Sequence, residues 1–96
     1  MHVISKKKLR EFWARHPQAK PPLQAWYKIA KAAEWQDFAE VRPTLGSADR
    51  VGRFVVFNIG GTKFRLIAAI HYSRGKLFFR HVLTHEEYDR DNWKSD

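Results

Sequence analysis

The sequence predicts one α+β domain over residues 1–96, with two N-terminal helices packed on a mainly antiparallel sheet of about four strands and a short C-terminal helical turn. A chain of 96 residues can bury one core but not two. Its 44% hydrophobic and 15% aromatic content favours a packed core over disorder. Apolar side chains recur with helical period in the first third and alternate with period two after residue 53.

The first segment predicts an edge strand followed by a basic helix. His2–Ile4 is short, extended and apolar, and Ser5 can cap the helix that follows. From Lys6 to His16 the apolar side chains fall on one face: Leu9, Phe12 and Trp13. Pro17 ends this helix.

A second helix is predicted from the prolines at 21 and 22 to about Trp35, because proline is tolerated in a first helical turn. Trp26 and Trp35 are expected to anchor the core rather than to stack on bases. Residues 36–52 are rich in turn residues and predict a connection with at most one short helical or bridging piece.

Three successive strands are predicted at 53–58, 63–72 and 76–83, with glycine-containing turns between them. In the middle strand one face is apolar and is expected to face the helices: Phe64, Leu66, Ala68, Ile70 and Tyr72. Lys63 and Arg65 then lie on the open face. Both faces of the last strand are mostly apolar, so by analogy we place Arg80 on the open face and His81 inward or at a margin.

The end of the last strand predicts a helical turn. Thr84 and Glu87 have capping-box spacing, which puts His85 in the first turn and Tyr88 one turn beyond Thr84. Residues 89–96 are polar except Trp93 and are open to fraying.

Charge indicates an anionic partner. Eighteen Lys and Arg against ten Asp and Glu give a net charge of +8, for which nucleic acid is the default partner, although anionic membranes and acidic proteins attract the same field. No cysteine, signal peptide or long apolar run is present, so we expect a soluble, cytoplasmic protein. The run Lys6, Lys7 and Lys8 is either a solvated helix face or a contact to RNA or a partner.

A polar set could converge at one end of the sheet: Arg65, Arg80, His85 and Tyr88, with Asn58 or Lys63 nearby. RNA cleavage by attack of a 2'-hydroxyl needs a base, an acid and cations for the developing phosphorane charge, and these residue types can supply them. His2 and His16 show no such constellation, while His71 stays a remote candidate through its parity with Arg65. No metal-ligand or nucleotide-cofactor motif appears.

Two motifs resemble a known family: Asn58-Ile59-Gly60-Gly61 followed by Phe64-Arg65-Leu66, and Arg80 followed by Thr84-His85 and Glu87-Tyr88-Asp89. With the opening residues 1–5 and the basic helix after them, they resemble the HigB-type toxins, a branch of the RelE-like mRNA interferases of bacterial toxin–antitoxin systems. The resemblance implies a microbial-RNase-like fold, cleavage of mRNA in the ribosomal A site and a helix-turn-helix antitoxin as partner.

The resemblance also implies residue roles: Arg65 as the phosphate or transition-state cation, His85 as acid or base, and Tyr88 as an RNA-positioning or stacking residue. We further expect RNA contacts from Asn58, Lys63, Arg80, Lys6, Lys7 and Lys8, and no metal or other cofactor. Two alternatives use the same cations without catalysis: a basic RNA- or ribosome-binding module, and an interaction subunit for an acidic protein.

Overall fold

The computed structural model describes residues 1–90 and 92–95 and places helices on a sheet of five strands, where the sequence predicted about four. In chain order the elements are β1 (His2–Ile4), α1 (Lys6–Arg15), α2 (Lys20–Ala32), α3 (Phe38–Thr44), β2 (Asp49–Val51), β3 (Phe54–Ile59), β4 (Phe64–His71), β5 (Lys76–Thr84) and α4 (His85–Asp89). No helix among these residues is long and apolar enough to cross a membrane.

The strand order is β1-β5-β4-β3-β2. β1 is the predicted edge strand and runs parallel to β5, whereas the other neighbours pair antiparallel. The additional strand, β2, lies in the connection for which the sequence predicted at most one short helical or bridging piece, and α3 is a short helix in the same connection. β2 has only three residues, two of them exposed and charged, so it shows no apolar alternation.

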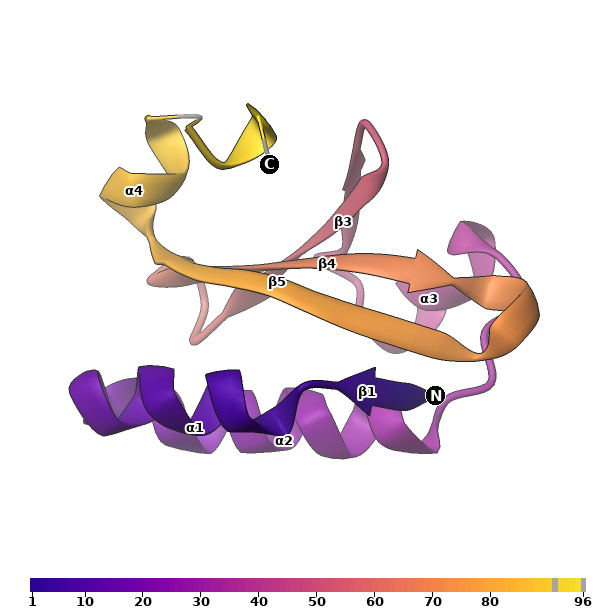
Figure 1. Cartoon of the computed structure of the whole chain (residues 1–96), viewed down its shortest axis with the longest axis horizontal. Helices are drawn as coiled ribbons and strands as arrows, with labels where there is room; N and C mark the ends of the chain where they lie inside the picture. The colour runs from indigo at the N-terminus through magenta and orange to yellow at the C-terminus, as the bar shows by residue number, and fades with distance from the viewer. Residues whose placement is uncertain (91, 96) are drawn as a thin grey trace.

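α1 and α2 cover one face of the sheet (Figure 1). α2 carries Pro21 and Pro22 in its first turn, as predicted, but it ends at Ala32 rather than near Trp35. Ala33 has extended backbone with ψ 152°, which turns the Trp35 ring back into the core. Trp26 and Trp35 are 3% and 4% exposed, so their prediction as core anchors is confirmed.

The face parity predicted for β4 is confirmed. Phe64, Leu66 and Ala68 are buried in the core beneath the helices, and Ile70 and Tyr72 pack against it. The opposite face of β4, which carries Arg65, belongs to the side of the sheet that α1 and α2 do not cover.

A second apolar cluster occupies this opposite face, which we call the open face. It consists of Phe54, Val56, Ile67 and Trp93, with Tyr88 and Leu83 packed against it. Figure 1 shows α4 and the short helical turn Asn92–Ser95, which we call the C-terminal segment, on the side of the sheet away from α1 and α2. The prediction that the tail is open to fraying is therefore wrong at Trp93, which is 4% exposed.

A β-bulge resolves the ambiguous parity of β5. Ile67 pairs with His81 and Ala68 with Phe79, so Arg80 is the extra residue between them. Because of this extra residue, Phe79 and Val82 both reach the helix-side core, while His81 joins Arg80 on the open face. Arg80 is exposed there as predicted, whereas His81 is half-buried and does not point into the core.

Candidate functional site

The predicted catalytic residues lie at one end of the sheet, where β3 ends, β4 begins and β5 ends. Asn58 pairs with Arg65 across β3 and β4, and Arg65 pairs with Leu83 across β4 and β5. Residues directly opposite each other in antiparallel strands share a face, so these three side chains form a row on the open face. Asn58 is exposed and Arg65 is half-buried.

The Arg65 guanidinium is held from two directions. Its Nη1 donates a hydrogen bond of 2.8 Å to the carbonyl oxygen of Thr62 in the β3–β4 turn. Its Cζ lies 5.4 Å from the centroid of the Tyr88 ring, at the outer range of a cation–π contact. Within the described residues, the hydrogen bonds of this guanidinium start from Nη1, so the fork of donors keeps capacity for a phosphate.

α4 is fixed at the strand end by the predicted capping box. The Thr84 hydroxyl accepts a hydrogen bond from the Glu87 backbone N–H at 3.2 Å, and the Thr84 backbone N–H donates to Glu87 Oε1 at 2.9 Å. The backbone N–H of His85 donates to the carbonyl oxygen of Lys63, which ties α4 to the start of β4. These bonds hold Tyr88 over Arg65 and place Lys63 at the same end of the sheet.

Glu87 makes this cap sensitive to pH. The backbone hydrogen bond from Thr84 lowers the pKa of Glu87 below its ordinary value of 4.5, against a smaller opposing effect of burial. A lowered folded-state pKa contributes stability above pH 4.5, and that stability is lost as the pH falls through the folded value.

We therefore expect Glu87→Gln, which keeps an acceptor for the capping box, to lower the free energy of unfolding by roughly 0.3 kcal/mol at pH 7. The difference from the parent chain should be smaller at pH 3, because protonation of Glu87 removes the charge that glutamine lacks. Urea unfolding at the two pH values measures this. A deficit of equal size at both values would show that charge on Glu87 does not support the cap.

His85 forms a pair with a carboxylate on the same helical turn. Its Nε2 lies 3.2 Å from Asp89 Oδ2, four residues along α4, and the two side chains are 57% and 60% exposed. A carboxylate on one ring nitrogen orients an imidazole and leaves the other nitrogen for proton exchange. Sequence reasoning missed Asp89 as this partner, although its i, i+4 spacing from His85 was visible in a predicted helix.

Trp93 packs against the Tyr88 ring, and sequence reasoning also missed this role. Its ring stacks on Tyr88 with centroids 5.2 Å apart and planes at 15°, and it meets the edge of Phe54 at 6.0 Å. The Trp93 Nε1–H donates a hydrogen bond of 3.1 Å to the Tyr88 carbonyl oxygen. One large aromatic residue in an otherwise polar tail was the available signal, since exposing an indole to water is unfavourable.

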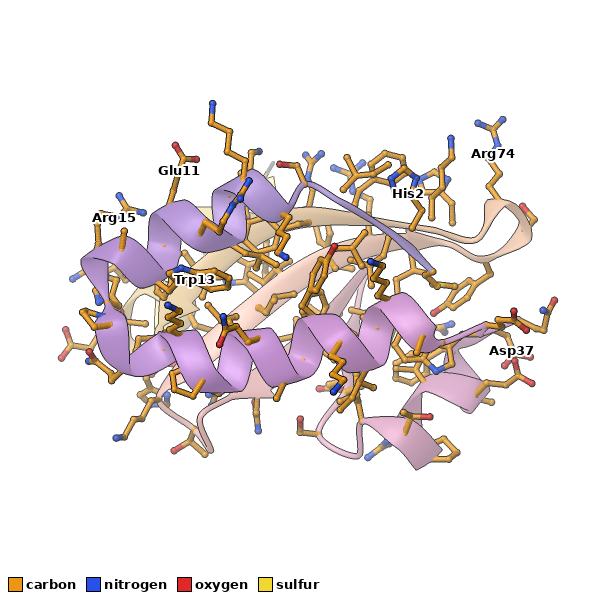
Figure 2. All side chains as sticks on the ribbon, turned by 90° about the horizontal axis from the view of Figure 1, so that it is seen from below. His2, Glu11, Trp13, Arg15, Asp37 and Arg74 are labelled. Carbon is orange, nitrogen blue, oxygen red and sulfur yellow. The ribbon has the colours of Figure 1, made fainter. Side chains whose placement is uncertain are left out.

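The remaining predicted RNA contacts do not join this cluster. Arg80 lies three residues before Leu83 on β5, roughly 10 Å along the strand. Lys6, Lys7 and Lys8 are exposed on α1, which covers the other face of the sheet (Figure 1). Lys6 lies over the Tyr27 ring of α2 at 4.7 Å, and both residues line a hollow that also includes Trp13. Figure 2 shows Trp13 between α1 and α2.

Two further histidines, His16 and His71, lie against aromatic rings. His16 stacks on Phe12 at 4.5 Å and meets the edge of Phe64 at 5.8 Å, and His71 contacts Phe78 at 5.0 Å. Among residues 1–90 and 92–95, no three His, Cys, Asp or Glu side chains lie close enough together to hold a metal ion.

The fold and the cluster define a class of protein: a small basic RelE-like α+β domain, with helices on one face of its sheet and an Arg–Tyr–His set at one end of the other. Residues 19–91 match the HigB toxin family, described as the RelE-like toxic component of a toxin–antitoxin system. The chain belongs to this family, and membership implies an antitoxin partner.

Relatives match over most of the chain. The mRNA interferase toxin HigB of Escherichia coli strain K12 is 34% identical over 92 residues, which cover 93% of this chain and 88% of that protein. The mRNA interferase HigB of Shigella flexneri gives the same values. The mRNA interferase HigB of Escherichia coli O6:H1 strain CFT073 is 29% identical over 93 residues, or 94% of this chain and 90% of that protein.

Proposed function

We propose that this chain is the toxin of a toxin–antitoxin pair and an endoribonuclease that cleaves mRNA on the ribosome and so inhibits translation. The observation that carries the proposal is the Arg65–Tyr88 contact beside the His85–Asp89 pair, at one end of the open face. Relatives named mRNA interferases support it, as does the net charge of +8. Because the substrate is mRNA, we place the protein in the cytoplasm.

The chemistry follows from what RNA cleavage requires. The 2'-oxygen attacks the adjacent phosphorus and the bond to the 5'-oxygen breaks, so one proton leaves the 2'-hydroxyl and one reaches the departing oxygen. His85 carries one of these protons as base or acid, and water at this exposed site carries the other. Arg65 stabilises the extra negative charge on the phosphorane oxygens. The products are a 2',3'-cyclic phosphate and a 5'-hydroxyl, with no metal ion in the reaction.

For Tyr88 the packing favours positioning through the hydroxyl over stacking on a base. Trp93 stacks on the Tyr88 ring and the Arg65 guanidinium lies over it, so the ring faces already have neighbours. The phenolic hydroxyl can still donate to or accept from RNA.

Around this centre, the exposed side chains of Asn58 and Lys63 bind the RNA strand. Arg80, Lys6, Lys7 and Lys8, which are all exposed, contact RNA farther away. A helix-turn-helix antitoxin neutralises the toxin, and an acidic segment of it would complement the basic surface.

His85→Ala is expected to lower the cleavage rate by roughly 100-fold or more, because the variant lacks the group that transfers a proton. The measurement is single-turnover cleavage of mRNA on programmed ribosomes, with analysis of the RNA ends. Cyclic phosphate ends support the proposed route, and 3'-hydroxyl ends contradict it.

His2→Ala is the matched control, since His2 is an exposed histidine on β1 and lies outside the cluster. It should cleave like the parent chain and arrest bacterial growth equally well. A chain that binds ribosomes in a salt-sensitive manner but leaves mRNA intact would instead be a noncatalytic RNA-binding module.

A further inference from the structure

A groove lies at the other end of the open face, where β3 begins, β4 ends and β5 begins. It has a volume of about 510 Å³, and we call it the distal groove; its walls are Arg53, Phe54, Ala69, Ile70, His71, Phe78 and Arg80. Ala69 pairs with Phe78, and Ala69 and His71 share their β4 parity with Arg65. The distal groove and the Arg65 cluster therefore occupy the same face of one sheet.

The β5 bulge brings Arg80, one of the two arginines of this groove, to the open face. Phe78 faces the open side through its pairing with Ala69, and the extra residue brings Arg80 onto the same side. Arg80 is exposed, and the Arg53 guanidinium lies at the other wall, 4.9 Å over the Phe54 ring. Among the described residues, those that line the groove include no acidic side chain.

The groove combines cations with aromatic surface. His71 is exposed and meets the Phe78 ring at 5.0 Å with planes at 77°, so an imidazole and a phenyl ring in edge-to-face contact line the same groove as the two arginines. Single-stranded RNA is held by this combination, with arginine on the phosphates and aromatic rings against the bases.

Cations continue from the groove toward the Arg65 cluster. A second hollow beside it contains Arg53 and Lys94, and the Lys94 ammonium lies 5.7 Å over the Trp93 ring, which itself stacks on Tyr88. Four to six residues of β4 separate Arg65 from Ala69 and His71, or roughly 13 to 20 Å along the strand. That span corresponds to about four to six stacked nucleotides.

We propose that the distal groove binds the mRNA strand a few nucleotides away from the phosphate that is cleaved, with Arg80 on a phosphate and Phe78 and His71 against a base. This inference rests on the proposed function, because it takes the Arg65 cluster as the cleavage site. The groove residues position the substrate and take no part in bond breaking.

The test uses Arg80→Ala and Phe78→Leu, which remove a charge and an aromatic face while the apolar volume at 78 is largely kept. Binding of fluorescent single-stranded RNA of 4 and 12 nucleotides is measured by anisotropy. We expect each variant to weaken binding of the longer RNA by about tenfold and to leave the shorter one unchanged. Arg80→Ala should also reduce the salt dependence of log K by about 0.7.

Arg74→Ala is the matched control, because Arg74 is exposed at the β4–β5 turn and points away from the sheet in Figure 2. It removes the same charge and should bind both RNAs like the parent chain. Equal losses for Arg74→Ala and Arg80→Ala would overturn the proposal, since they would reflect net charge alone.

Cleavage on ribosomes distinguishes mRNA from ribosomal RNA as the strand that the distal groove binds. With an mRNA that extends beyond the cleaved codon on both sides, Arg80→Ala should raise KM about tenfold and change kcat by less than twofold. With an mRNA trimmed to the cleaved codon region, the parent and the variant should match. A KM increase of the same size on both mRNAs would assign the groove to ribosomal RNA and overturn the proposal.

Failure of this inference is distinguishable from failure of the proposed function. If the parent chain cleaves mRNA and His85→Ala does not, while the groove variants behave like the parent, only the groove assignment is wrong. If the parent chain never cleaves mRNA, the proposed function is wrong. If the groove variants lose antitoxin binding but keep RNA binding, the groove is a protein-docking site and the inference is overturned.

Discussion

Replacing Arg65 with alanine is expected to slow mRNA cleavage by roughly 10²- to 10³-fold, equivalent to about 3 to 4 kcal/mol of transition-state stabilisation. The guanidinium is held by Thr62 and Tyr88 before substrate arrives, so little reorganisation is needed when charge develops on the phosphate. Arg65→Lys keeps the charge but loses the planar fork of donors, and we expect an intermediate rate. Single-turnover cleavage on programmed ribosomes measures all three proteins.

The fold should survive this change, because Arg65 is only half-buried and hydrogen-bonds to a surface turn. Arg42→Ala is a matched control for charge: Arg42 is exposed on α3, which lies far from α4 in Figure 1. A cleavage rate for Arg65→Ala within threefold of the Arg42→Ala rate would remove Arg65 from the proposed centre.

Replacing Trp93 with alanine is expected to lower the free energy of unfolding by about 3 kcal/mol or more. The indole is 4% exposed and packs with Phe54, Val56 and Ile67, so its loss opens a cavity on the open face. For a domain of this size such a loss shifts the melting temperature by more than about 10 °C. Activity should also fall, since Tyr88 loses the ring on which it stacks.

Trp93→Phe separates packing from hydrogen bonding. It keeps an aromatic ring between Phe54 and Tyr88 but cannot donate to the Tyr88 carbonyl oxygen, so we expect a loss nearer 1 kcal/mol. Thermal unfolding followed by circular dichroism compares the variants. If Trp93→Ala melts within 2 °C of the parent chain, the C-terminal segment does not stabilise the sheet as its contacts indicate.

The sequence predicted β4 well because its alternation is unbroken. One face carries only core side chains and the other carries Lys63 and Arg65, so parity alone placed Arg65 opposite the core. The capping box was equally local, since the spacing of Thr84 and Glu87 decides it without any distant contact. These two local signals placed Arg65, His85 and Tyr88 at one end of the sheet.

Other features depend on distant contacts that the sequence does not display. Both faces of β5 are apolar because helices cover one side and the C-terminal segment covers part of the other, and the bulge at Arg80 then breaks the alternation. α2 stops at Ala32, although the next residues favour helix, because burial of Trp35 outweighs propensity. Trp93 reaches Phe54 because α4 directs the chain back over the open face, and the sequence alone does not display this tertiary contact.

The parallel pairing of β1 with β5 has a consequence for synthesis. His2–Ile4 leave the ribosome well before their partners, Lys76–Phe78. This pairing cannot form until β5 has been synthesised, because the loop between the partners must close first. The β1 edge of the sheet therefore forms late, and the sheet of a nascent chain stays incomplete until its own ribosome has translated β5.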